Sequence, residues 1–173
     1  MNDLLSEDRL SSIRLRLDPF LNWNLAAWQG LPELPVQALN RLFAAPASEE
    51  TAELGWYPAQ RLEYPVDNVP SGGLVAYARD NRVRLIEAIV PPPSSVIDTL
   101  EEPSAILPNE ISVQGAYVPE YLYCQRGLVL SVARPFDETQ PLRVLRCRGI
   151  HPIERPDQFD TELYRSEQTK TFW

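Results

Sequence analysis

Residues 35–91 contain, in order, PVQALNRLFAAP (35–46), GWYPAQRLEY (55–64), GGLVAYA (72–78) and VRLIEAIVP (83–91). A similar series follows up to residue 152: PSSVIDTLEEP (93–103), GAYVPEYLYC (115–124), RGLVLSVA (126–133) and LRVLRCRGIHP (142–152). The spacing between the two series changes only in loop-like stretches, where insertions are tolerated. The sequence therefore predicts an internal duplication. The alternative is that two unrelated runs of short amphipathic strands align once gaps are allowed.

Each copy has the pattern of a helix followed by antiparallel strands. In the first copy, Pro35 precedes an apolar stripe formed by Val36, Leu39, Leu42 and Phe43, which is typical of an amphipathic helix. Strand-like runs follow at about 52–66, 73–79 and 82–90. Asp80-Asn81, between the last two runs, indicates a tight hairpin.

Further helices are expected on either side of the duplicated region. The spacing of apolar residues predicts a helix over 7–17 that ends at Asp18-Pro19, and a second helix over 20–31 that Gly30 stops. Trp23 and Trp28 on the second helix are expected to anchor the core. The last stretch opens as a short helix with Phe159 on its apolar side, and Trp173 either packs back onto the body or belongs to a tail.

The predicted fold class is thus α+β. It consists of two tandem units, each a helix plus an antiparallel sheet of three to four strands, preceded by N-terminal helices. The expected divisions are N-terminal helices (1–31), repeat unit 1 (32–91), repeat unit 2 (92–152), and a C-terminal helix and tail (153–173).

Composition limits the range of functions. The chain has 173 residues and a formal net charge of −8, and nucleic-acid binding needs clustered Lys and Arg instead. No apolar run approaches the roughly 18–20 residues that cross a bilayer, and MNDLLSEDRLSS (1–12) has no apolar signal region. We therefore expect a cytoplasmic protein, a monomer or weak dimer, without a membrane or nucleic-acid partner. Cys124 and Cys147 are expected to be reduced core thiols, with a cross-strand pair as the alternative.

The repeated unit resembles that of the β-lactamase inhibitor protein family, which also occurs singly in outer-membrane assembly lipoproteins of the BamE (SmpA/OmlA) type. In the first copy the resemblance rests on LNRLFAAPAS, WYPAQRLEY and LVAYARDNRVRLIEAI, and in the second on VIDTLEEPSA, YVPEYLYC, LVLSVA and LRVLRCRG. The family's Leu-Gly-x-Pro step is degraded in both copies, and the lipobox cysteine is absent. The resemblance implies helices on one face of a curved antiparallel sheet, and a surface that binds another protein.

Catalytic and metal-binding signatures are absent from the sequence. The single histidine, His151, lies beside a proline without a nucleophile pattern or metal-ligand spacing, and neither a P-loop nor G-x-S-x-G occurs. The acidic pairs lie in predicted turns, where solvation explains them: Glu49-Glu50, Glu101-Glu102 and Asp137-Glu138. We therefore expect no enzyme, no cofactor and no metal.

Aromatic and acidic residues on the predicted strands are the candidate partner-binding site. They are Trp56, Tyr57, Tyr64, Tyr77, Tyr117, Glu120, Tyr121 and Tyr123. Exposed tyrosines on a rigid sheet bury a large area in a complex at a small entropy cost. Tyr121 and Tyr123 share one face of a strand, opposite Leu122. Either the tyrosines face outward, or they form the core and Leu122 is exposed.

The predicted function is a non-catalytic protein-binding module, most concretely an acidic cytoplasmic immunity or inhibitor protein that occludes a basic toxin or enzyme. The alternative is a structural or assembly subunit of a phage, a secretion system or another multiprotein complex. A third hypothesis is an enzyme with an unfamiliar site around His151, Arg146 and Arg148.

Overall fold

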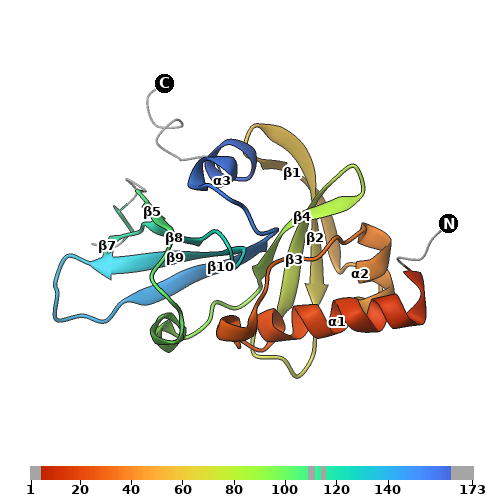
Figure 1. Ribbon diagram of the computed structural model, residues 1–173, viewed down its shortest axis with the longest axis horizontal. Helices are drawn as coiled ribbons and strands as arrows, with labels where there is room; N and C mark the ends of the chain where they lie inside the picture. Colours follow the sequence, from red (N-terminus) through yellow and green to blue (C-terminus); the bar gives the residue numbers. More distant parts are fainter. Residues whose placement is uncertain (1–4, 109–111, 114–115, 165–173) are drawn as a thin grey trace.

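The computed structural model describes residues 5–108, 112–113 and 116–164 (Figure 1). The helical elements are α1 (Glu7–Leu21), η2 (Leu25–Ala27), α2 (Val36–Phe43), η3 (Ser94–Thr99) and α3 (Pro156–Glu162). The strands are β1 (Ser48–Leu54), β2 (Tyr57–Pro65), β3 (Gly73–Arg79), β4 (Arg82–Ala88), β5 (Ala105–Leu107), β6 (Ser112–Val113), β7 (Ala116–Tyr117), β8 (Glu120–Tyr123), β9 (Leu128–Pro135) and β10 (Arg143–Ile150).

Among the described residues, ten strands form one antiparallel sheet. Its main order is β1-β2-β3-β4-β10-β9-β8-β5, and β7 and β6 continue it beside the end of β9. The first four strands and the last four of this order meet where β4 pairs with β10, with Glu87 opposite Arg148 and Leu85 opposite Ile150. The expected α+β class with N-terminal helices and an antiparallel sheet is confirmed. The strands do not form two separate sheets, because this pairing joins them into one.

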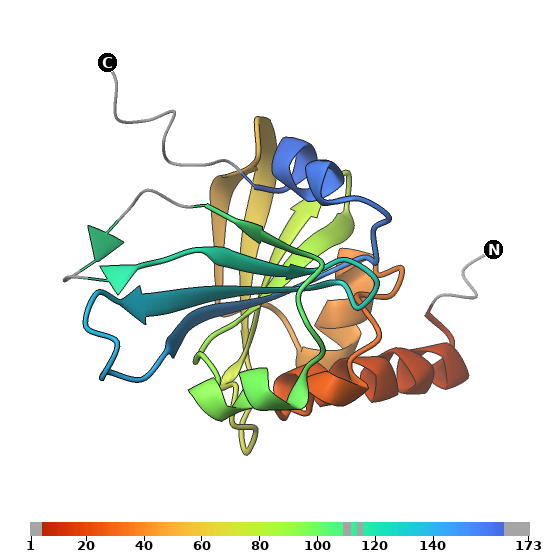
Figure 2. The same cartoon turned by 60° about the vertical axis from the view of Figure 1, so that its left-hand side comes forward.

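Both faces of the sheet are covered. α1, α2 and η3 lie on one face, where their apolar residues share the main core with residues of β2, β3, β4, β8, β9 and β10. α3 lies on the opposite face, where Phe159 packs with Leu54, Leu85, Leu122 and Ile150 in a second cluster. Figure 1 shows α1 and α3 on opposite sides of the sheet, and Figure 2 shows η3 beside the end of α1.

The N-terminal region differs from its prediction. α1 continues through Pro19 to Leu21, because a proline in the last turn removes only one hydrogen bond and both Phe20 and Leu21 are fully buried. The expected helix over 20–31 is reduced to the short η2. Trp28 is the expected core anchor: it is 1% exposed, and its Nε1 donates to the carbonyl of Gly127 at 3.0 Å.

The predicted strand at 52–66 is two strands, since the chain turns at Gly55 and Trp56 and β1 pairs with β2 in register from Ser48–Glu63 to Leu54–Tyr57. The sequence of β1, SEETAEL, is rich in glutamate, which has a low strand propensity. Its composition therefore does not indicate a separate strand. The predicted hairpin is confirmed, because Asp80 and Asn81 both have positive φ, 51° and 62°, as the turn between β3 and β4 requires.

The two cysteines are free and buried, as expected for reduced core thiols. Cys147 belongs to the main core, whereas Cys124 belongs to the cluster under α3, on the opposite face of the sheet. This placement is incompatible with the alternative of a cross-strand pair. Burial raises the pKa of the Cys147 thiol, which keeps it protonated and unreactive. None of the described helices is long and apolar enough to cross a bilayer.

Candidate functional site

The sheet opens into a notch between β2 and β3. Their pairing extends only as far as Gln60 and Ala78, so within the described part of the chain residues 57–59 of β2 pair with β1 alone. A cavity of about 660 Å³ lies at this point, next to the end of α3. It is lined by Thr51, Tyr57, Pro58, Ala59, Gln60, Ala78, Arg79, Asp80, Arg84 and Glu162.

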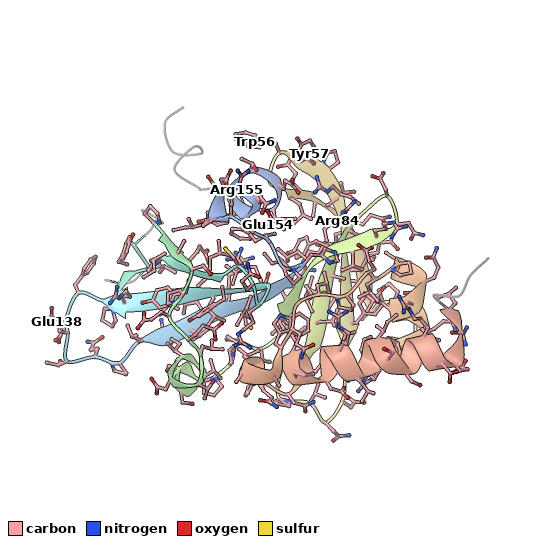
Figure 3. The ribbon with its side chains drawn as sticks, in the orientation of Figure 1. Trp56, Tyr57, Arg84, Glu138, Glu154 and Arg155 are labelled. Carbon is pink, nitrogen blue, oxygen red and sulfur yellow. The ribbon has the colours of Figure 1, made fainter. Side chains whose placement is uncertain are left out.

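An aromatic tip stands at the edge of this notch. Trp56 is 60% exposed and Tyr57 is 51% exposed, at the turn between β1 and β2. Gly55 has a φ of 56°, and a Cβ there would lie 2.9 Å from the carbonyl oxygen of Glu162. Glycine thus allows both the turn and the close approach of the hairpin to α3. Figure 3 shows Trp56 and Tyr57 at the same end of the molecule as Arg84, Glu154 and Arg155.

Two arginines belong to the notch. The guanidinium carbon of Arg79 lies 4.9 Å from the centre of the Tyr57 ring, within the range of a cation–π contact. Arg84 occupies a β-bulge, since the β3–β4 register steps from Tyr77–Leu85 to Ala78–Val83. Its Nε is buried and has no hydrogen-bond partner among the described residues.

Three of the predicted surface tyrosines are buried in the main core: Tyr64, Tyr121 and Tyr123. Tyr121 and Tyr123 face the α1 side of the sheet, and Leu122 is buried beneath α3, so both faces of β8 are covered. These tyrosines therefore present no binding surface. The hydroxyl of Tyr64 donates to Oδ1 of Asn40 at 2.8 Å, and burial raises the pKa of Tyr64 to about 12.

Glu120 is also inaccessible, at 2% exposure. It forms an ion pair with Arg148 and accepts a hydrogen bond of 2.8 Å from the hydroxyl of Ser131. The Arg148 guanidinium lies 5.7 Å from the Phe159 ring centre and 5.8 Å from that of Tyr164. Because a buried carboxylate needs such partners, Glu120 serves this internal ion pair and not a surface.

Tyr77 and Tyr117 are partly buried, and Tyr77 packs against the cluster under α3. Of the eight predicted binding residues, all of them in the described ranges, only Trp56 and Tyr57 are among the large exposed hydrophobic residues. Their role in binding stays a prediction.

His151 connects two parts of the backbone. Its Nδ1 lies 2.8 Å from the carbonyl oxygen of Leu31, and its Nε2 lies 3.3 Å from that of Val83. A neutral imidazole carries one N–H group, so His151 donates to one of these two carbonyl groups at a time. Within the described ranges, no three His, Cys, Asp or Glu side chains are grouped so that they could hold a metal ion.

The sequence reasoning missed Arg79 and Arg84. Arg79 directly precedes the Asp80-Asn81 turn, which the sequence does predict. That position was a usable signal, because a residue at the end of a hairpin lies beside the neighbouring strand of the sheet. The bulge that positions Arg84 depends on the pairing between β3 and β4, which has no local signature.

No protein-family model matches this chain, and no match is found among curated proteins or among solved structures.

Proposed function

We propose that this protein is a non-catalytic protein-binding module whose contact surface is the β1–β2 hairpin tip together with strand β1. The observation that carries the proposal is the exposed pair Trp56 and Tyr57, 60% and 51% accessible beside a cavity of about 660 Å³. Tryptophan and tyrosine are the side chains most often found to dominate binding energy at protein interfaces.

Two contacts hold the tip against the rest of the fold before a partner binds. The hairpin approaches α3 closely at Gly55, and Arg79 stacks on the ring of Tyr57. A side chain that is ordered before binding loses less conformational entropy in the complex.

The charge of the surface supports a basic partner. Among the described strands, β1 lies at the edge and pairs with β2 alone, and it carries the exposed Glu49, Glu50 and Glu53, in a chain with a net charge of −8. The most concrete form of the proposal is an acidic immunity or inhibitor protein that covers a basic surface of a toxin or enzyme. An acidic surface of this kind accelerates association with a basic partner at low salt.

A second candidate, an assembly subunit, draws on the same edge strand, because an open edge is a template for pairing with another chain. The glutamates of β1 oppose pairing with a second copy of itself, since like charges would face each other. Light scattering separates the two candidates: a monomer supports the inhibitor, and a stable homo-oligomer supports the assembly subunit.

The proposal includes an origin from two copies of one unit, as in the resemblance to the β-lactamase inhibitor protein family. Support comes from the order of the elements. α2 precedes the four strands β1–β4, and η3 precedes a second antiparallel series, β5, β8, β9 and β10.

The experiment begins with affinity capture from the native host, followed by measurement of the purified complex by surface plasmon resonance. We expect Trp56→Ala and Tyr57→Ala each to weaken affinity at least about tenfold, as typical hot-spot residues do. Phe136→Ala is the matched control, because Phe136 is 70% exposed and lies two residues before Glu138, which Figure 3 places at the left of the molecule, away from the tip. Unchanged affinity in both tip variants, or an equal loss in the control, contradicts the proposal.

A further inference from the structure

We infer that the notch between β2, the β3–β4 hairpin and α3 is a binding site for an organic carboxylate, with Arg84 as the main contact and the Tyr57 ring as its apolar wall. The inference rests on the juxtaposition of a cavity, an unsatisfied guanidinium nitrogen and an exposed aromatic ring. It does not depend on the proposed protein partner, because small ligands test it directly.

The first support is the state of Arg84. A buried N–H group without an acceptor is destabilising, so such groups are rare in folded proteins. Three other arginines of this face have carboxylate partners: Arg61 pairs with Glu50 and Glu63, Arg146 with Glu87, and Arg148 with Glu120. Within the described residues Arg84 has no such ion pair, although it lines the cavity. A carboxylate in the cavity would supply the charge partner that Arg84 lacks among the described residues.

The second support is the way the backbone positions this side chain. The bulge makes Arg84 an extra residue opposite the Tyr77–Ala78 step, and bulges redirect side chains next to functional sites. Arg82, two residues earlier on the same strand, instead donates to Oε2 of Glu33 at 3.0 Å and does not line the notch. The strand therefore directs Arg84, and not Arg82, into the cavity.

The third support is the size and charge of the notch. About 660 Å³ lies within the usual range of small-molecule sites and exceeds the needs of a bare inorganic ion. Arg79 and Arg84 are balanced by Asp80 and Glu162 in the lining, so the notch does not concentrate anions by net charge. Recognition must come from direct contact, which favours a carboxylate that accepts from a guanidinium and carries an apolar body to pack against Tyr57.

The test uses 3-phenylpropanoate and its uncharged analogue 3-phenylpropanamide, titrated into the ¹⁵N-labelled full chain. Signals of the arginine Nε–H groups and of the Ala59 and Ala78 amides report binding. Ordinary ligand efficiency predicts a dissociation constant of about 1–10 mM for the carboxylate. We expect the Arg84 Nε–H signal to move with saturation, and the amide analogue to bind at least about tenfold more weakly.

Three variants make the test specific. Arg84→Gln should weaken carboxylate binding at least about tenfold, whereas Arg82→Gln should bind like the wild type. Glu162→Gln should strengthen binding, because it removes a like charge from the lining of the site. Unperturbed backbone spectra of the free variants verify that they are folded. Equal binding of acid and amide, equal binding by Arg84→Gln, or no saturable binding in this range overturns the inference.

Discussion

The β1–β2 turn and strand β8 hold their tyrosines at different depths. In the first half, Tyr57 at the β1–β2 turn is 51% exposed, whereas Tyr121 and Tyr123 on β8 in the second half are 7% and 2% exposed. Residues of α1 lie in the same core as the β8 tyrosines, while the β1–β2 hairpin extends to the margin of α3. The comparison teaches that tyrosine on a strand indicates a binding surface only where the neighbouring helices leave it uncovered.

The strongest way to sharpen this comparison is to truncate one tyrosine from each half. Tyr123→Ala removes a buried ring from the main core and should lower the free energy of unfolding by about 4 kcal/mol. Tyr57→Ala loses an exposed ring and its contact with Arg79, and should cost no more than about 1 kcal/mol. Urea denaturation followed by circular dichroism measures both. Equal losses would show that exposure does not separate the two positions.

The buried ion pair in the second half provides the next effect. Arg148→Met leaves the Glu120 carboxylate buried without its guanidinium and should cost about 3 kcal/mol. The double variant Glu120→Leu/Arg148→Met should recover most of this loss, because no charge is then buried. Urea denaturation of the single and double variants gives the coupling free energy between Glu120 and Arg148. A double variant as unstable as the sum of the two single variants would contradict the interpretation.

Alkaline pH tests the buried tyrosines of both halves together. Burial raises the pKa of Tyr64, Tyr123 and Tyr164 to about 12 in each case. The fold favours the neutral phenol of each tyrosine. Their contribution to the free energy of unfolding is therefore fully present below the unfolded pKa of about 10, and it is lost as the pH rises towards 12. Two pKa units correspond to about 2–3 kcal/mol for each residue.

The measurement is the free energy of unfolding between about pH 8 and 12, with tyrosine ionisation followed by ultraviolet absorbance. Tyr123→Phe should remove part of the alkaline slope, and Tyr64→Phe should remove another part. A slope that neither substitution changes would assign the alkaline loss to other groups.

The smallest expected effect concerns the hairpin turn of the first half. Asn81 has a φ of 62°, a conformation that asparagine tolerates better than alanine. Asn81→Ala should therefore cost about 1 kcal/mol, and Asn81→Gly should be close to neutral. Thermal unfolding of the two variants checks this difference. An alanine variant as stable as the glycine variant would indicate that the turn relaxes.

The sequence carried much of the local structure but little of the site. The apolar stripe of α2 and the Asp80-Asn81 turn were visible, because helix periodicity and turn chemistry are local properties. The burial of Glu120 could not be foreseen, since it depends on Arg148, which is distant in the chain and becomes its partner only in the folded sheet. The bulge at Arg84 likewise depends on strand register.

The pairing of β4 with β10 also has a consequence during synthesis of the protein. β10 is the last of the described strands to leave the ribosome, so β4 has an open edge until the chain has been made at least as far as Ile150. An unpaired edge with buried neighbours such as Val83 and Ile86 is a template for association between nascent chains. Pairing with the second half of the sheet thus protects the open edge of β4. A polypeptide stopped before β10 would be prone to aggregate.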